Sequence, residues 1–315
     1  MVHRAREGDL LVIARRKDGS LLVLLCPADS TIGAQLLWLF GLDLIPGRAA
    51  ARELGAEDSI TLGLAARAVL DDLGIEIEEP QPDAFDMLVD RFGLSFPGTA
   101  EFSAFARETL PGIEAAGDPD GALMAWMEHE EALFRHLERE VVAERLKAGF
   151  MERGQADVDG FLKFSLSVQN RRKSRAGYAF GHHTEAVLRA AGVRYVREAT
   201  TEKRNAADFL FPGEAEYADA RFPAEGLTML GVKTTCKDRW RQVLAEADRI
   251  REKHLLTLEP AISRAQTAEM QAQDLRLVLP LGLHETFHSD QQGWLMGVTD
   301  FLDLVRAGGS GDVLL

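Results

Sequence analysis

Two short apolar runs near the N-terminus, Asp9–Ala14 and Leu21–Cys26, flank a polar segment that contains the pair Asp18-Gly19. An Asp-Gly turn signal between two β-prone runs predicts a β-hairpin. Apolar residues then crowd together over Thr31–Leu42, and their spacing is helical over Leu64–Leu73. We expect both segments to be packing elements, the second of them a helix.

A longer pattern follows residues 75–121, a stretch that is rich in proline, glycine and acidic residues. Over Met124–Ala148 the apolar positions have helical spacing, charged residues occupy the outer face, and Gly149 follows. This pattern predicts a long helix that ends at the glycine. The end of this helix, or the segment Met151–Gly160 after it, is the candidate domain boundary.

The second half of the chain alternates between helix-like and strand-like segments. It opens with four cations within Arg171–Arg175, before the amphipathic pattern begins. The expected elements are, in order, a helix at Tyr178–Ala191, strands at Val193–Val196, Ala207–Phe211 and Leu227–Val232, a helix at about Asp238–Lys253, a strand at His254–Leu258, a helix from about Ala261, a strand at Arg276–Leu279 and a last helix near Gln292–Val305. An alternating α/β order of this kind predicts a mixed sheet flanked by helices.

Composition excludes several classes of protein. The chain has 315 residues, of which 46% are hydrophobic and 27% charged, so it is neither disordered nor fibrous. Its longest apolar runs are far shorter than the ~20 residues of a bilayer span, and no signal-type apolar segment follows the basic N-terminus. The two cysteines, Cys26 and Cys236, cannot build a disulfide framework or a four-cysteine zinc site. We therefore expect a soluble cytoplasmic protein without a membrane partner.

The charge is distributed unevenly along the chain. The net charge of −14 argues against a nucleic-acid partner if it is taken as an average. Residues 1–150, however, hold 14 Lys and Arg against 27 Asp and Glu, a net charge of −13, while the remainder holds 22 against 23. Such asymmetry predicts two domains, an acidic N-terminal α+β domain over residues 1–150 and an α/β domain over residues 155–315.

Three residues of the second half suit phosphodiester hydrolysis. Asp208 begins a predicted strand, Lys233 ends a later one, and Glu246 lies on the helix expected after it. Two carboxylates can hold Mg²⁺, which polarises a phosphoryl oxygen and acidifies a bound water, while the ammonium orients that water or neutralises developing charge. A segment with 23 acids offers many such triples, so composition alone favours this site only weakly.

The helix expected over Asp238–Lys253 would place Arg239, Gln242 and Glu246 on one face. Arg239 could then contact guanine O6 and N7, and Asp238 could accept from cytosine N4. The plainer interpretation is a solvated helix with Trp240 buried behind it. The run Arg171–Arg175 is likewise either a phosphate clamp or an exposed loop rich in cations.

Other chemistries have little support in the sequence. The adjacent His182 and His183 would point to different faces of a helix, with no Cys or His cluster nearby in sequence, so a zinc site is not expected. Cys236 lacks a histidine partner in a recognisable arrangement for nucleophilic catalysis. No Gly-x-Ser-x-Gly elbow and no phosphate loop occur, which excludes acyl transfer and nucleoside-triphosphate chemistry.

Several motifs in the second half occur together and in a specific order. They are Asn170-Arg171-Arg172-Lys173-Ser174-Arg175-Ala176-Gly177, Asp208-Phe209-Leu210-Phe211-Pro212, Phe222-Pro223-Ala224-Glu225, Lys233-Thr234-Thr235-Cys236-Lys237-Asp238-Arg239-Trp240-Arg241-Gln242, Glu246-Ala247-Asp248-Arg249-Ile250, His254-Leu255 and Thr257-Leu258. Over about residues 161–305 the chain closely resembles the catalytic C-terminal domain of the EcoRII-type restriction endonucleases. An ordered set of this length is far more specific than a short motif.

The resemblance implies a PD-(D/E)XK nuclease core that cleaves both strands of duplex DNA with Mg²⁺ as a homodimer. It makes Asp208 and Glu246 the metal-binding acids and Lys233 the catalytic lysine, with Tyr217 and Lys237 in or beside the active site. Its implied DNA contacts are Asp238 and Arg239, which would read a C:G pair, together with Arg241, Arg171, Arg172, Lys173 and Arg175.

As for function, the resemblance implies a type II enzyme acting at a CC…GG site, CCWGG-like, with a DNA methyltransferase as its functional partner. A non-cleaving DNA-binding protein and a nicking repair nuclease are the alternatives on the same fold. The intact set of Asp208, Lys233 and Glu246 argues against the first.

The chain departs from the superfamily pattern at two positions. Ala207 replaces the usual proline before the first acid, and Gly231 stands two residues before the lysine, where an acid is common. Neither change removes a catalytic group if Glu246 supplies the second carboxylate. Residues 1–150 match no motif of the family's N-terminal effector domain, so we expect them to regulate the nuclease or, alternatively, to serve assembly alone.

Overall fold

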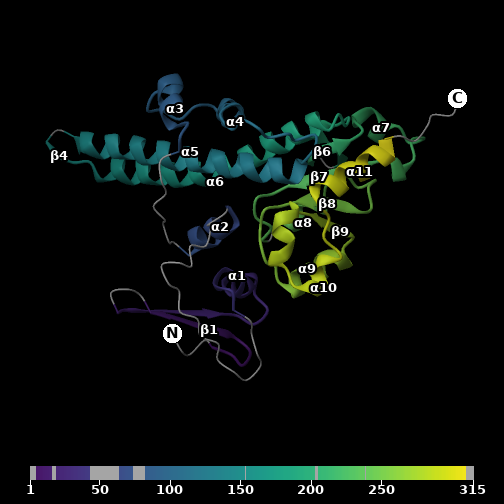
Figure 1. Ribbon diagram of the computed structural model, residues 1–315, viewed down its shortest axis with the longest axis horizontal. Helices are drawn as coiled ribbons and strands as arrows, with labels where there is room; N and C mark the ends of the chain where they lie inside the picture. Colours follow the sequence, from purple (N-terminus) through teal and green to yellow (C-terminus); the bar gives the residue numbers. More distant parts are fainter. Residues whose placement is uncertain are drawn as a thin grey trace.

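The computed structural model describes residues 5–15, 19–42, 64–73, 82–152, 154–202, 205–237 and 239–309. Two long helices run side by side along the molecule, and a mixed sheet with its own helices packs near one end of them (Figure 1). The N-terminal hairpin and its helix lie below the long helices in the same view. In the described chain no helix combines the length and the apolar character that a membrane crossing needs.

The predicted N-terminal hairpin is confirmed. Strands β1 (Leu10–Arg15) and β2 (Leu21–Cys26) pair in antiparallel register, while the Asp18 part of the turn signal lies outside the described residues. Helix α1 (Thr31–Phe40) begins where the Ser30 side chain accepts a hydrogen bond from the Gly33 amide. Helix α2 (Leu64–Asp72) confirms the helical spacing read from the sequence.

The region rich in proline, glycine and acids contains two short helices that the sequence analysis did not identify. Helices α3 (Phe85–Phe92) and α4 (Thr99–Glu108) pack against helix α5 (Pro119–Ala148). Their shared cluster is aromatic and aliphatic, and its buried members include Phe85, Leu88, Phe102, Phe105, Leu133, Phe134 and Leu137. Segments of two or three turns owe most of their stability to such packing, so their local pattern is weak.

The long helix α5 confirms the predicted one and begins five residues before Met124. A tight hairpin of β3 (Met151–Glu152) and β4 (Gln155–Ala156) joins it to α6 (Val158–Ala190), which returns along it. Our prediction of a helix that starts only at Tyr178 was wrong, because the basic run lies inside α6. Arginine and lysine are good helix formers, and several of these cations pair with acids on α5.

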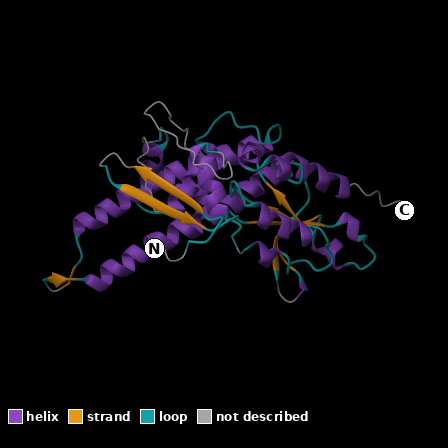
Figure 2. Ribbon diagram, turned by 90° about the horizontal axis from the view of Figure 1, so that it is seen from below, coloured by secondary structure: helices purple, strands orange, loops and turns teal. Residues whose placement is uncertain are grey.

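The five-stranded sheet confirms the predicted mixed α/β architecture. Its order is β5 (Val196–Thr200), β6 (Ala206–Phe211), β7 (Thr228–Val232), β8 (Lys253–Leu256) and β9 (Leu275–Val278). The pairs β5–β6 and β6–β7 are antiparallel, and the pairs β7–β8 and β8–β9 are parallel. Helices lie on both sides of these strands (Figure 2), namely α7 (Glu214–Ala218), α8 (Trp240–Val243), α9 (Arg264–Ala272), α10 (Ser289–Gln292) and α11 (Val298–Gly309).

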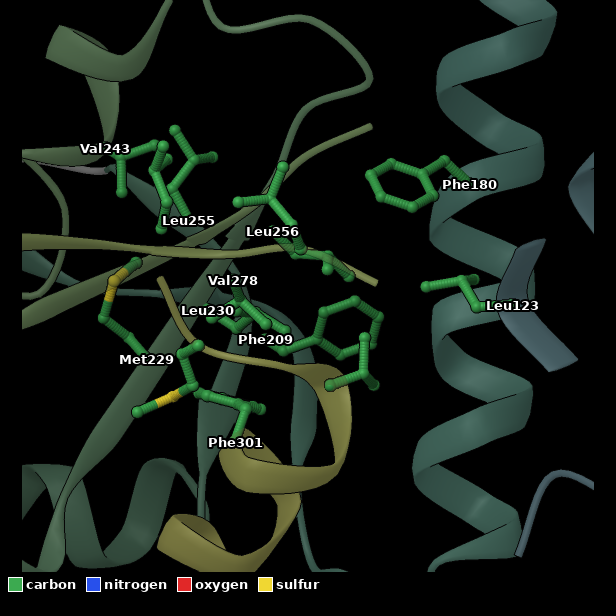
Figure 3. Packing of buried hydrophobic residues seen from close by; sticks show 14 of the residues in the cluster. Leu123, Phe180, Phe209, Met229, Leu230, Val243, Leu255, Leu256, Val278 and Phe301 are labelled. Atoms are coloured by element: carbon green, nitrogen blue, oxygen red, sulfur yellow. The ribbon is translucent and has the colours of Figure 1, made fainter. Parts of the chain in front are cut away.

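The main hydrophobic core joins the sheet to both long helices (Figure 3). Leu123 of α5 and Phe180 of α6 are fully buried in the same cluster as Phe209, Leu255 and Phe301. The candidate boundary near residues 150–155 falls in the hairpin between these helices. The division into residues 1–150 and 155–315 therefore passes through one packed core.

Two expected helices differ from the structure. The helix expected over Asp238–Lys253 is limited to α8, and Lys253 already begins β8. After α8 the backbone continues in turns that bond three residues back, from Ala245 to Gln242 and from Glu246 to Val243. The error has a simple source. The buried residues have helical spacing although they do not lie on one continuous helix; they are Trp240, Val243, Ala247 and Ile250.

The last helix, expected near Gln292–Val305, is instead two helices, α10 and α11. Between them the chain pairs with the sheet, because the Met296 amide donates to the Leu277 carbonyl and the Leu279 amide donates to the Met296 carbonyl. A helix through this segment would lose both bonds.

Candidate active site

Two neighbouring strands bring Asp208 and Lys233 together. Asp208 lies on β6, Lys233 directly follows β7, and these strands pair with Phe209 opposite Leu230. The Lys233 Nζ lies 2.6 Å from Asp208 Oδ2, and the Val232 amide donates to the same oxygen at 2.7 Å. Both side chains keep partial solvent access at the end of the strands. The ammonium is therefore fixed beside a carboxylate that a ligand can still approach.

Glu246 reaches the same site from the turn after α8. Its residue is only 8% exposed, and its Oε2 is buried without a hydrogen-bond partner. Burial raises the pKa of Glu246 to about 7; the Lys233 charge opposes this shift and the Asp208 charge adds to it. The three residues thus form one electrostatically coupled group.

Gly231 explains how this turn can approach the sheet. A Cβ at position 231 would lie 2.8 Å from Val243 Cγ2 and 3.1 Å from Val243 Cγ1, so α8 packs where a side chain would otherwise stand. The departure noted at this position in the sequence therefore has a structural reason. The glycine makes room for α8, the segment that leads to Glu246.

Substitution of Gly231 by alanine should push α8 away from β7. Overpacking of this kind costs about 1–3 kcal/mol, which urea denaturation would measure. The double variant Gly231→Ala with Val243→Ala removes both clashing methyl groups and should recover part of the loss in stability. If the single alanine variant is as stable as the parent, the close packing described here is wrong.

Tyr217 of α7 contacts the backbone of the segment that follows Glu246. Its hydroxyl donates to Glu202 Oε2 at 2.5 Å and accepts from the Arg249 amide at 3.3 Å. Burial, followed by the hydrogen bond to Glu202, raises the pKa of Tyr217 to about 12. This places Tyr217 as a support of the turn.

Lys237 is exposed in the loop between β7 and α8, with a positive φ of 35°. The buried Glu259 holds this loop, since its Oε2 accepts from the amides of Cys236 and Lys237. The Lys237 carbonyl accepts from Gln266 Nε2 at 2.9 Å. Glu259 was missed by the sequence analysis because no local pattern connects it to a loop more than twenty residues earlier.

Arg239 and Arg241 are both exposed next to this loop. Arg239 Nη2 donates to the Thr235 carbonyl at 2.9 Å and to Thr235 Oγ1 at 2.6 Å. Arg241 pairs with Glu269 at 2.6 Å and stacks over the ring of Trp240, which is buried as the plainer interpretation expected. Asp238 lies outside the described residues. Arg239 and Gln242 face solvent while Glu246 is buried, so the three do not share one face.

The basic run of α6 requires a correction. Arg175 is 5% exposed, and its guanidinium pairs with Glu130 at 3.2 Å and with Glu131. Arg172 pairs with the buried carboxylate of Glu138. Neither guanidinium is presented as a phosphate contact, because each is engaged by acids of α5.

The other two cations of the run lie at the surface. Arg171 is exposed and stacks 4.2 Å from the centroid of the Phe96 ring, and Lys173 is exposed. Together with Arg172, whose side chain is still 37% exposed, these two cations of the predicted clamp remain accessible, while Arg175 does not.

His183 and Cys236, for which the sequence supports neither a zinc site nor a nucleophile, are buried in the fold. His183 is fully buried, with Nε2 2.8 Å from Glu130 Oε2, and burial lowers its pKa. Cys236 is buried, and burial raises the pKa of its thiol, which opposes thiolate formation.

The residues at the Asp208 site fit a hard divalent cation. The described chain holds no cluster of three or more His, Cys, Asp or Glu side chains able to bind a metal ion. Mg²⁺ does not need one, since it is commonly held by one or two carboxylates, with water and phosphate oxygens completing its shell. Glu246 adds a buried carboxylate oxygen without a hydrogen-bond partner, and its charge interacts with those of Asp208 and Lys233, so the donor type that such an ion takes is present.

Comparison with known proteins gives consistent matches. Residues 134–302 match the family described as EcoRII C terminal. The type II restriction enzyme EcoRII of Escherichia coli is 36% identical over 230 residues, which is 73% of this chain and 55% of that enzyme. The chain thus spans about half the length of this relative.

Solved structures share the fold at lower identity. Metal-depleted Ecl18kI in complex with uncleaved, modified DNA matches with a TM-score of 0.58 and 19% identity, covering 73% of this chain and 86% of that one. The complex of restriction endonuclease PspGI with substrate DNA matches with a TM-score of 0.57 and 17% identity, covering 69% and 95%.

The family match begins at Phe134 within α5, and it extends through the segments that carry Asp208, Lys233 and Glu246. It covers more than half of the sequence. The chain therefore belongs to the EcoRII C-terminal family.

Proposed function

We propose that this protein is a type II restriction endonuclease that hydrolyses phosphodiester bonds in duplex DNA with Mg²⁺. The observation that carries the proposal is the convergence of Asp208, Lys233 and Glu246 from separate segments on one coupled site. Membership of the EcoRII C-terminal family and similarity to the restriction enzyme EcoRII support the reaction.

The chemistry follows from the donor types. Asp208 and Glu246 would hold the cation, which when bound polarises the phosphoryl oxygen and acidifies a water. Lys233, held by Asp208, places its ammonium where negative charge develops on the phosphoryl oxygens. The depth of Glu246 keeps this carboxylate away from bulk water, which strengthens its interaction with a cation.

We further propose a CC…GG recognition site, CCWGG-like, by homology with the family. Arg239 supports this proposal, because it is exposed at the loop that follows Lys233 and bonds to Thr235 of the same loop. Its Nη2 gives both of its hydrogens to Thr235, so a bidentate contact with guanine would displace at least one of these bonds. The exposed Arg241, Arg171 and Lys173 would contribute phosphate contacts.

Arg239→Ala should weaken discrimination between the cognate duplex and a duplex with one altered C:G pair by about 1–3 kcal/mol. The ratio of the two binding affinities is measured by competition binding in Ca²⁺. The control is Lys163→Ala, which removes an exposed cation from α6, away from the loop of Arg239. An unchanged ratio for Arg239→Ala would remove this residue from base recognition.

The alternatives are separated by labelling each strand of a CCWGG duplex. A homodimer on a near-palindromic site should cut both strands, a nicking enzyme should cut one, and a binding-only protein should retain the duplex intact. A shuffled duplex serves as the control. The proposal fails if Mg²⁺ produces no cut in either strand of several candidate duplexes.

Regulation by the N-terminal residues has a physical basis in the contacts of α1. Gln35 is buried and donates to the Pro260 carbonyl at 3.2 Å, and Thr31 Oγ1 donates to Gln266 Oε1 at 2.9 Å. Gln266 in turn bonds to the Lys237 carbonyl. We propose that α1 restrains the loop of Lys237 through this chain of contacts. Assembly alone is the alternative.

The double variant Thr31→Val with Gln35→Ala removes these two bonds and the bond that the Thr31 hydroxyl accepts from the Ser263 amide, each worth about 1 kcal/mol. We expect it to cleave several times faster than the parent, with unchanged specificity. The control is size-exclusion chromatography, in which an unchanged elution volume shows that the oligomeric state is the same. A cleavage rate of the double variant that is equal to or below that of the parent, at the same elution volume, would argue against restraint by α1.

A further inference from the structure

The segment that carries Glu246 has no regular secondary structure of its own. Between α8 and β8 the backbone forms only turn bonds, and Ala247 adopts a positive φ of 49°. Nothing in a series of isolated turns fixes a carboxylate to the accuracy that a metal ligand needs. The position of Glu246 must therefore come from contacts with other segments.

One side of this turn is held by residues that follow β5. Asn205 Nδ2 donates to the Ala245 carbonyl at 2.6 Å. The buried Thr201 Oγ1 accepts from the Ala247 amide at 3.2 Å. These two bonds flank Glu246 directly, since they engage the residue before it and the residue after it.

The other side is held by Lys253, the first residue of β8. Its side chain is buried, with the residue 6% exposed, and its Nζ donates to the Ala247 carbonyl at 2.9 Å and to the Ile250 carbonyl at 2.8 Å. The strand that carries Lys253 is paired on both sides, with β7 and with β9. The ammonium therefore ties the turn to a rigid part of the sheet.

Burying the Lys253 ammonium to donate to two carbonyls costs desolvation free energy. Burial lowers the pKa of Lys253, while the charges of Asp248, Glu246 and Glu202 oppose that effect. A neutral residue would serve a purely structural purpose at lower cost in desolvation.

We propose that Lys253 is a positioning residue for Glu246, fastening the turn at Ala247 and Ile250 so that the carboxylate faces Asp208 and Lys233. Asn205 completes the same clamp from the opposite side. This inference rests on the proposed function, because it assigns Glu246 as a ligand of the divalent cation.

The experiment compares Lys253→Met with the parent and with Arg251→Met. Methionine keeps the length of the side chain and removes its donors. Arg251 is an exposed cation two residues earlier that pairs with Asp274, so its variant loses the same charge without loosening the turn. Binding of Mn²⁺ to the purified protein is followed by the signal of free Mn²⁺ in electron paramagnetic resonance, and the Mg²⁺ concentration for half-maximal cleavage is measured separately.

We expect Lys253→Met to weaken Mn²⁺ binding by about 10–100-fold and to raise the half-maximal Mg²⁺ concentration by a similar factor. Arg251→Met should bind Mn²⁺ like the parent. Asn205→Ala, at a half-buried loop position, should also weaken Mn²⁺ binding and raise the half-maximal Mg²⁺ concentration. This variant replaces Lys253→Met in the test if the methionine variant does not fold.

Unchanged Mn²⁺ affinity in folded Lys253→Met, or in Asn205→Ala if the former does not fold, overturns the positioning role while leaving the proposed function intact. An equal loss in Arg251→Met also overturns it, because general charge would then explain the effect. A parent protein that neither binds Mn²⁺ nor cleaves DNA overturns the proposed function itself, and the positioning role with it.

Discussion

Replacement of Lys233 by alanine is expected to reduce the rate of DNA cleavage by at least about 10²–10³-fold at saturating Mg²⁺, the usual cost of removing one group that stabilises transition-state charge. The expectation follows from geometry. The ammonium is held 2.6 Å from Asp208 Oδ2 at the end of β7, so its removal takes away a positive charge that is fixed at the cleavage site. DNA affinity should change little, because a lysine within the cleavage site adds little to a broad phosphate interface.

Single-turnover cleavage and filter binding in Ca²⁺ together measure these effects. Lys163→Ala, which removes an exposed cation from α6, is the control and should keep both properties. Full cleavage by Lys233→Ala would show that the site lies elsewhere. Parallel loss of binding and cleavage would mean that Lys233 serves the DNA interface rather than the reaction.

Replacement of Glu246 by glutamine should abolish metal-dependent cleavage and, in the absence of metal, make the protein more stable at pH 8. The pKa of Glu246 is raised in the folded state to about 7, from an ordinary value of 4.5. Folding therefore favours the protonated form. The parent loses stability as pH rises from 4.5 through 7, and above pH 7 the cost is constant. Since a tenfold change in the ionisation equilibrium corresponds to about 1.4 kcal/mol, the gain for glutamine is of order 3–4 kcal/mol at pH 8.

Urea denaturation in EDTA at pH 5.5 and pH 8 measures this difference. The advantage of Glu246→Gln should be smaller at pH 5.5, where the parent carboxyl is mostly protonated in the folded state. An advantage of equal size at both values would contradict the raised pKa. The same reasoning predicts that the parent needs less Mg²⁺ for half-maximal cleavage as pH rises through 7, because the cation binds the ionised form.

The strands that position Asp208 and Lys233 could be predicted from the sequence because they depend on local signals, whereas the site itself was assigned by the family resemblance. Strands β6 and β7 are short apolar runs, and each site residue lies on or directly after one of them. The motifs around them also carried the family resemblance, which the family match confirmed.

What could not be predicted depends on contacts between distant segments. The basic run looks like an exposed loop until α5 is placed beside it, because only then do Glu130, Glu131 and Glu138 meet Arg175 and Arg172. The turn that carries Glu246 has the apolar spacing of a helix. Its conformation is held instead by side chains of other segments, such as Lys253, which donates to two of its carbonyls. Neither relation leaves a periodic signal in the chain.

We propose that this protein cuts both strands of DNA at a defined sequence with Mg²⁺. This reaction is tested by incubating the purified protein with Mg²⁺ and a plasmid of known sequence and then sequencing all ends, with EDTA and Lys233→Ala as controls. We expect discrete double-strand ends at one repeated CC…GG motif, absent in both controls. A plasmid left intact by the parent, or ends that persist in EDTA, would rule out this reaction.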